Sequence, residues 1–176
     1  MANSLYAHGR ELFLEGGTDA LTDALKISLV TTGYTPNLAT DQFYSAISGG
    51  NIVAAGVALS SRTGSAGTLS AANVIFTSVS GSTASYIPLY VDSGTSSTSP
   101  LLGLIDTASG LPVTPNGGDI TVAWASGQVF TLFEGLPESE KGKLNKFLEW
   151  LRDVAGIPAK LGPGGIWIPE PRIVLA

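Results

Sequence analysis

The stretch LKISLV at Leu25–Val30 alternates apolar and polar side chains over its first five positions. Successive side chains of a β-strand point to opposite faces, so this period of two predicts a strand with one buried face. The leucine and isoleucine side chains would lie on the buried face, and Lys26 on the solvated one. Residues 33–37, with the sequence GYTPN, are typical of a loop and end the strand.

Downstream of this stretch, short β-like runs are separated by turn residues. The runs lie at residues 52–59, 73–79, 86–91, 101–105, 120–124 and 128–132. The Gly- and Ser-rich spacers between them, such as 64–67, are typical of loops, and residues 125–127 indicate a hairpin. Pro88 lacks a backbone donor, which favours an edge strand or a bulge. Short strands separated by turns in this way predict a mainly β fold, with an antiparallel sandwich or jelly-roll-like core.

Upstream of the first strand, apolar residues recur at helical spacing as far as Gly16. They predict a short N-terminal helix over residues 4–15, with Asn3 as its N-cap and Gly16 as the residue that ends it. Residues 38–50 are ambiguous, because their large apolar side chains could share one short helical turn.

Charged residues are rare in most of the chain. They make up 13% of the sequence, about half the share of an ordinary soluble domain. From residue 27 to residue 132 they are Asp41, Arg62, Asp92, Asp106 and Asp119. A free monomer normally stays soluble through a mixed, charged surface, whereas an uncharged surface costs little to desolvate on assembly. The pattern favours a chain covered by neighbouring subunits; the alternative is a Ser/Thr-rich soluble β-domain.

The composition divides the chain into a core domain, residues 1–132, and a more charged C-terminal part, residues 133–176. Pro137 suits the first turn of a helix, and an apolar stripe follows as far as Gly156. Residues 161–176 are too rich in Pro and Gly for a helix, yet their apolar side chains would be badly exposed on a lone monomer. We therefore expect a C-terminal helix and an extended arm that docks on a neighbour. The alternative is that both fold back on their own sheet.

Several classes of protein are disfavoured. The net charge is −5 and there is no basic cluster, which argues against nucleic-acid binding. The absence of cysteine removes disulfides and thiol chemistry. The first residues lack the basic and apolar regions of a signal peptide, and no apolar run approaches the roughly 20 residues of a membrane span. We expect a protein that is made in the cytosol and contacts neither nucleic acid nor membrane.

No group of residues has the spacing of a catalytic or metal site. His8 is the only histidine, and no second feature near it completes a triad or a metal constellation. Asp92, Asp106 and Asp119 could together hold a calcium ion, but their spacing matches no calcium loop and Asp is an ordinary turn residue. The glycines of residues 64–67 lack the Lys of a phosphate loop. We expect no enzymatic activity, no metal and no cofactor.

One long string, GLPVTPNGGD at residues 110–119, is distinctive. It lies within residues 104–124, and the further stretches that carry the resemblance described next are residues 1–6, 11–16, 25–30, 34–40 and 90–94. Through these stretches, about residues 1–132 of the chain resemble the small virion proteins of tailed bacteriophages.

The resemblance implies a head decoration or cement protein. Such a protein has a jelly-roll-like fold, lies on the outer capsid surface of the virion after synthesis in the host cytoplasm, and bridges subunits of the major capsid protein. It commonly binds copies of itself as a homotrimer. The C-terminal part of this chain departs from the pattern.

Candidate anchors for these partners are the large apolar residues outside the predicted strands, because buried aromatic side chains often carry most of the energy of an interface. In the C-terminal part they are Phe147, Trp150, Trp167, Ile168 and Ile173. In the N-terminal helix the second candidates are Leu5, Tyr6 and Phe13.

Two other functions remain open. The first is a tail, neck or fibre-base adaptor of the virion, which would share the same composition. The second is a carbohydrate-binding module for host attachment, with stacking faces supplied by Tyr34, Tyr44, Tyr86 and Trp124. These aromatic residues lie on or beside predicted strands, which also suits packing in a core.

Overall fold

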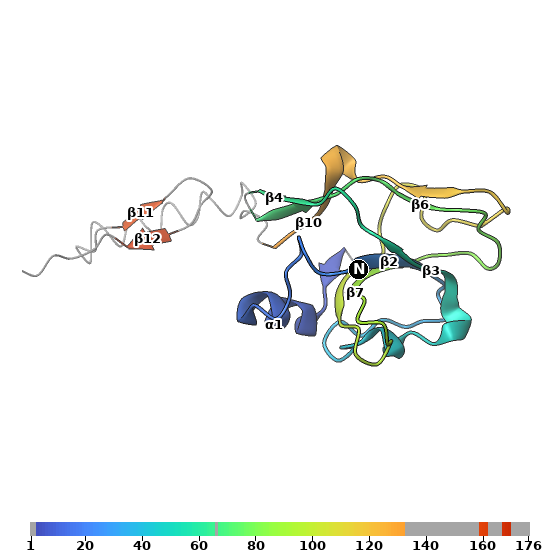
Figure 1. The fold of residues 1–176 in the computed structure, drawn as a ribbon, viewed down its shortest axis with the longest axis horizontal. Helices are drawn as coiled ribbons and strands as arrows, with labels where there is room; N and C mark the ends of the chain where they lie inside the picture. The colour runs from blue at the N-terminus through green and yellow to red at the C-terminus, as the bar shows by residue number, and fades with distance from the viewer. Residues whose placement is uncertain (1–2, 66, 133–158, 162–166, 170–176) are drawn as a thin grey trace, which may run out of the picture. The chain divides into compact units, whose positions relative to one another are not determined.

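The structure, a computed structural model, describes residues 3–65, 67–132, 159–161 and 167–169. The chain divides into two compact units, Met1–Thr131 and Leu132–Ala176. The first unit is mainly β, as the sequence predicts (Figure 1). Its elements are β1 (Ser4–Leu5), α1 (Ala7–Glu15), β2 (Leu25–Val30), the 3-10 turns η1 (Tyr44–Ala46) and η2 (Gly49–Asn51), β3 (Ile52–Ala58), β4 (Thr63–Ser65), β5 (Thr68–Ser70), β6 (Val74–Phe76), β7 (Ile87–Val91), β8 (Leu101–Ile105), β9 (Ile120–Val122), η3 (Ala125–Gly127) and β10 (Gln128–Thr131).

The largest sheet has five strands in the order β1-β8-β7-β2-β3, and every neighbouring pair is antiparallel. The strand β2 is paired on both sides, with Ile27 opposite Leu89 of β7 and Val57 of β3. The strand β3 lies at one end of the sheet order. Its ladder with β2 shifts register twice, and each shift places an extra residue on β3.

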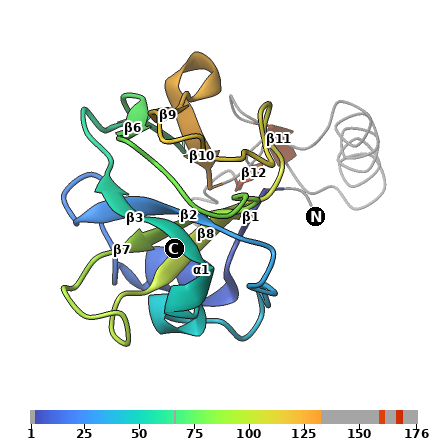
Figure 2. The same ribbon diagram turned by 90° about the vertical axis from the view of Figure 1, so that its right-hand side faces the viewer.

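Two smaller antiparallel sheets, β10-β5-β4 and β6-β9, lie over one face of the large sheet (Figures 1 and 2). Leu25, Ile27 and Leu29 of β2 belong to the main core cluster, which also contains Leu69 of β5 and Phe76 of β6. Full burial of an aliphatic side chain stabilises a fold by about 1.5–3 kcal/mol. The apolar face of β2 therefore joins the large sheet to the smaller ones.

The opposite face of β2 is also buried, contrary to the expectation of a single buried face. Ser28 has 0% of its surface exposed and accepts a hydrogen bond from the Tyr44 hydroxyl at 2.8 Å. Val30 belongs to a second core cluster with Tyr90, whose ring stacks on Tyr44 with centroids 4.1 Å apart. Lys26 is only partly exposed, since its ammonium group pairs with Asp92. The alternation in β2 thus separates two cores rather than a core from solvent.

The N-terminal helix begins later than the sequence predicts. Ser4–Leu5 forms β1, and α1 starts at Ala7. Asn3 is not an N-cap: its side-chain oxygen accepts the backbone N–H groups of Asp106 and Thr107 at 3.1 and 3.0 Å. Gly16 ends the helix in the left-handed conformation with φ 70°, as expected.

All six predicted downstream runs contain a strand, but some of their pairings differ from expectation. Gly64 and Ser65 belong to β4, which pairs with β5 as a hairpin, contrary to the expectation of a loop at residues 64–67. Residues 125–127 join two strands that pair elsewhere, β9 with β6 and β10 with β5. Pro88 lies in β7, which is not an edge strand, and the register shifts nearby between Leu89 and Tyr90. In the ambiguous region, Tyr44–Ala46 forms a short 3-10 turn.

In the second unit, β11 (Ala159–Leu161) and β12 (Trp167–Pro169) form an antiparallel pair, with Lys160 opposite Ile168. The predicted C-terminal helix lies outside the described residues. Within the described parts of the chain, no helix is long and apolar enough to cross a membrane.

The helix α1 rests closely on β8 through Gly9. A Cβ added at Gly9 would lie 2.5 Å from the backbone oxygen of Leu102 and 2.7 Å from its Cα. Because these are backbone atoms, they cannot rotate away.

We predict that Gly9→Ala destabilises the protein in spite of the better helix propensity of alanine. Propensity alone would add about 1 kcal/mol of stability, whereas overpacking costs about 1–3 kcal/mol. Urea unfolding followed by circular dichroism measures the difference. Gly49→Ala is the control, because its added Cβ meets no atom within 4 Å. A Gly9→Ala variant more stable than the parent would contradict the close packing of α1 on β8.

Stability should also fall at high pH. The Tyr34 hydroxyl donates to Asp41 Oδ2 at 2.7 Å and therefore accepts from the Tyr6 hydroxyl at 3.0 Å. Burial raises the pKa of Tyr6 to about 12 and also raises that of Tyr34 above its ordinary value. A tyrosine with a raised pKa contributes stability that is present below pH 10 and is lost as pH rises toward 12. The free energy of unfolding should thus fall between pH 10 and pH 12. The fall should be less steep in the Tyr6→Phe variant. A free energy of unfolding that does not change over this pH range would contradict the prediction.

Candidate subunit interface

The few charged side chains of residues 26–132 have partners inside the fold. Lys26 Nζ lies 2.5 Å from Asp92 Oδ2, and this contact holds the pKa of Asp92 below its ordinary value. Arg62 donates through Nη1 to the backbone oxygens of Ala20 and Asp23 at 2.9 and 2.5 Å. Both pairings tie β2 or the segment before it to distant parts of the chain.

The three other aspartates also have internal partners. Asp41 accepts from the Tyr34 hydroxyl, Asp119 accepts the Ser78 N–H at 2.8 Å, and Asp106 accepts from the Thr107 hydroxyl at 3.1 Å. All five charged side chains between residues 27 and 132 are thus engaged within the unit. What this stretch presents to solvent is mainly Ser, Thr, Ala and Gly, a surface that costs little to desolvate.

The strand β3 supplies an open sheet edge. Within the described residues it pairs with β2 on one side and has no strand on the other. Its sequence, IVAAGVA, contains no charged residue and no proline. Natural edge strands are usually protected by charges, proline, bulges or a covering segment; β3 has only the two register shifts against β2.

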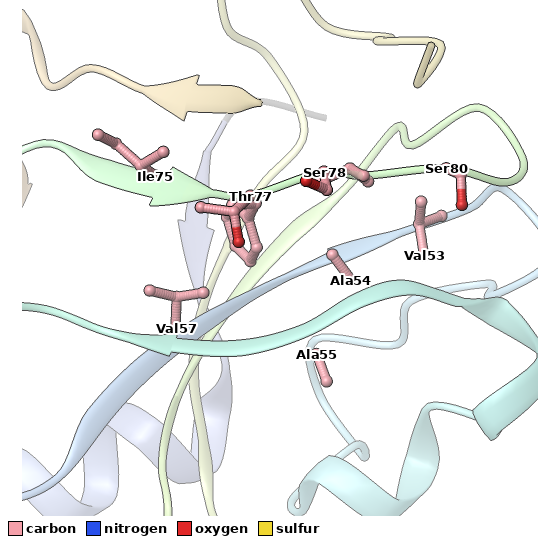
Figure 3. A pocket seen from close by; sticks show the side chains of 10 residues that line it. Val53, Ala54, Ala55, Val57, Ile75, Thr77, Ser78 and Ser80 are labelled. Atoms are coloured by element: carbon pink, nitrogen blue, oxygen red, sulfur yellow. The ribbon is translucent and has the colours of Figure 1, made fainter. Parts of the chain in front are cut away.

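A groove of about 350 Å³ runs beside this edge, between β3 and the segment that contains β6 (Figure 3). Val53 and Val57 point from β3 toward that segment, whereas Ala55 points the other way (Figure 3). The lining residues are Val53, Ala54, Ala55, Val57, Ile75, Phe76, Thr77, Ser78, Val79 and Ser80. None of them is charged. Ile75 keeps 51% of its surface exposed, so an apolar side chain remains uncovered beside the groove.

The far wall of the groove is held by the loop before β9. Ser78 has φ 51°, a left-handed conformation that is unfavourable for a residue with a side chain. Its N–H is bound by Asp119, while the Val79 N–H donates to the Gly118 oxygen at 2.9 Å. The Gly117 N–H donates back to the Val79 oxygen at 2.8 Å. These bonds keep the wall in place beside β3.

The N-terminal anchor candidates differ in their availability. Tyr6 is 0% exposed, and its hydroxyl bonds to Tyr34, so it is a core residue. Leu5 is partly buried in β1, and the Phe13 ring packs against Phe130 with centroids 5.5 Å apart. These three side chains therefore do not form one exposed patch.

The C-terminal anchor candidates lie in the second unit. Trp167 and Ile168 are on β12, in the β11–β12 pair. Phe147, Trp150 and Ile173 lie outside the described residues.

The aromatic residues considered for sugar stacking pack in the two cores. Tyr34 is buried, and its ring meets Tyr86 edge to face at 6.5 Å. Tyr44 stacks on Tyr90, and the Trp124 ring nitrogen donates to the Ala72 oxygen at 3.0 Å. Their arrangement favours the packing role over a sugar-binding face.

The residues considered for metal binding or catalysis are spread over the unit. Asp92, Asp106 and Asp119 have the separate partners given above, and the described residues contain no group of three His, Cys, Asp or Glu side chains placed to hold a metal ion. His8 lies on α1, 3.6 Å from Glu11 and edge to face with Phe43.

Sequence reasoning did not find the groove. The groove lies between β3 and the segment that contains β6. The sequence predicts both strands, but it does not show that they lie next to each other. The available signals were the run Val74-Ile75-Phe76, which is apolar on both faces, and the absence of charge in β3.

We predict that Asp119→Ala loosens the groove wall. The change removes the acceptor of the Ser78 N–H and with it a hydrogen bond to a charged group, so the free energy of unfolding should fall by about 1 kcal/mol. Chemical unfolding measures the effect, with Glu15→Ala as a control that removes an exposed carboxylate from the end of α1. Equal stability of the two variants would show that Asp119 does not hold the wall.

Neither of two sequence comparisons relates this chain to a known protein. No protein-family model matches it, and no curated protein matches it either. The low charge of residues 27–132 and the open edge of β3 are therefore the features from which its role is inferred.

Proposed function

We propose that this chain is a structural subunit of a tailed-phage virion, most specifically a capsid decoration or cement protein that binds the major capsid protein. The observation that carries the proposal is the scarcity of charge on the surface of residues 27–132. Between residues 27 and 132 all five charged side chains have partners inside the fold. The resemblance of residues 1–132 to small virion proteins is the reason for proposing a phage virion as the assembly.

The open edge of β3 supports the same proposal. A sheet edge without charges tends to pair with other chains, which is a hazard for a free monomer but useful in an assembly. The groove beside it is lined by uncharged residues, and Ile75 is half exposed at its side. Both features suit a protein that functions while in contact with other subunits.

The mechanism is mechanical. Packaged DNA presses outward on a capsid, and a protein bound across the seam between capsomers favours the assembled shell by its own binding free energy. An interface of roughly 1,600 Å² is enough for stable binding. If the chain forms oligomers, several such contacts act together and raise the strength of attachment through avidity.

The number of copies per particle tests the proposal. Quantitative mass spectrometry of purified virions should find the chain in hundreds of copies, in a fixed ratio to the major capsid protein. A small symmetric set of copies would instead assign the chain to the neck, the tail or a fibre base. Its absence from purified particles would refute a role in the virion.

Truncation tests which part makes the contact. The unit Met1–Thr131 has its own hydrophobic core, so a chain ending at Leu132 should still unfold cooperatively. If the C-terminal part carries the anchors, this truncated chain should lose most of its binding to capsids in a co-sedimentation assay. Undiminished binding by a folded truncated chain would remove the C-terminal anchors and leave the core surface as the contact.

A further inference from the structure

We propose that β3 pairs with β3 of a second copy across a two-fold axis at Val57, so that the large sheets of two chains join into one. The second copy adds its strand at the open edge, antiparallel to the first. This inference goes beyond the proposed function, because the pair does not require a capsid. It rests on the length, the charge and the backbone geometry of this edge.

The two edges of the large sheet differ in a way that favours β3 as a contact. At one edge β1 has two residues, and natural sheets often shorten an edge strand to prevent it from pairing with another chain. At the other edge β3 has seven residues, more than any other strand in the described parts of the chain. The longest strand thus occupies a position where an unprotected strand readily pairs.

The charge distribution favours a second copy as the occupant of this edge. A two-fold axis brings side chains near the axis close to the same side chains of the second copy, so a charged residue there would repel its own counterpart. Residues 42–61 contain no charged residue. Lys26, which lies opposite Ala58 on β2, is paired with Asp92. The edge therefore carries no unpaired charge that opposes pairing with itself.

The segment that contains β6 leaves this edge open. Val53 and Val57 point toward that segment (Figure 3), and the side chains of a strand stand roughly perpendicular to its sheet. The segment therefore lies over the face of β3 and not beside its edge. On the opposite face the space at Gly56 is filled from within, because a Cβ added there would meet the Tyr90 hydroxyl. What β3 offers to a second copy is its lateral backbone groups.

The ladder with β2 shows which backbone groups of β3 face outward. Leu59 donates its N–H to the Leu25 oxygen at 2.9 Å, so its backbone groups face β2. Backbone groups alternate in direction along an antiparallel ladder, and the register with β2 is regular at Val57 and Ala58. The N–H and C=O groups of Gly56 and Ala58 therefore face away from β2, where the described residues place no strand.

These outward groups are complementary to those of a second copy. With the axis at Val57, Gly56 of one chain lies opposite Ala58 of the other, and each such pair exchanges two backbone hydrogen bonds. The two Val57 residues then form a non-hydrogen-bonded pair, in which the Cα atoms lie about 4.5 Å apart. The ladder is short, because the Ser60 oxygen already accepts the Ala72 N–H at 3.0 Å and closes the edge there.

The absence of cysteine allows a direct test by disulfide trapping in the full-length chain. Val57→Cys places two sulfur atoms beside the axis, where the Cα separation suits a disulfide, about 4.4–6.8 Å. Mild oxidation should therefore yield a disulfide-linked homodimer as the main product. Ala55→Cys and Ala58→Cys are matched controls at exposed positions of the same strand. Each would lie more than about 7 Å from its counterpart and should link far less.

Two double variants test whether the backbone of β3 makes the contact. Ala58→Pro, combined with Val57→Cys, removes an outward N–H and should abolish the link, while the ladder with β2 persists because proline is tolerated where an edge N–H faces solvent. Ala58→Lys, combined with Val57→Cys, places a charge near the axis and should reduce the link severalfold. Circular dichroism melts verify that every variant is folded.

Three outcomes would overturn the proposal. They are the absence of a disulfide in folded Val57→Cys, equal yields at the three cysteine positions, and an undiminished link in both folded double variants. Capsid binding is measured separately on the cysteine-free chain. A link without capsid binding refutes only the virion role, and capsid binding without the link refutes only the pairing of β3.

Discussion

The strand β2 has to be buried on both faces, and the rest of the core is arranged around that constraint. Leu25, Ile27 and Leu29 face the smaller sheets, while Ser28 and Val30 face a second cluster built from tyrosines. A polar residue in that position needs a partner, because an unsatisfied buried hydroxyl would cost free energy. Tyr44 meets this need, and its ring in turn packs on Tyr90. Lys26 lies at the margin of this face and pairs with Asp92.

This internal use of polar groups determines what the surface can do. Asp41, Asp119 and Arg62 form hydrogen bonds inside the fold. They position Tyr34, Ser78 and the segment before β2, respectively. The surface of residues 27–132 carries few charges, and the sheet ends in β3 with a groove of uncharged residues beside it. Few unpaired charges therefore remain on residues 27–132 to disfavour contact with other subunits. We therefore relate its packing directly to its proposed role in an assembly.

Local patterns allowed the strands to be predicted from the sequence, but not their neighbours. Runs such as residues 101–105 were found because apolar and β-branched residues stand between turn signals. The β4–β5 hairpin was missed because Gly64 and Gly67 look like loop residues, and the second buried face of β2 depends on Tyr44, sixteen positions away. The groove requires the sheet order, which places β3 at an edge. The uncharged stretch, in contrast, was visible from composition alone.

Hydrogen exchange at β3 tests most directly whether the core is built to be covered by other subunits. Amides of residues 52–58 would be followed in the dilute, isolated chain and in the chain bound within its assembly. Covering the open edge should slow exchange strongly in β3 and in the groove segment of residues 75–80, with little change in β2, which is already paired on both sides. Equal exchange of β3 in the two states would mean that this edge stays open to solvent and would contradict the account.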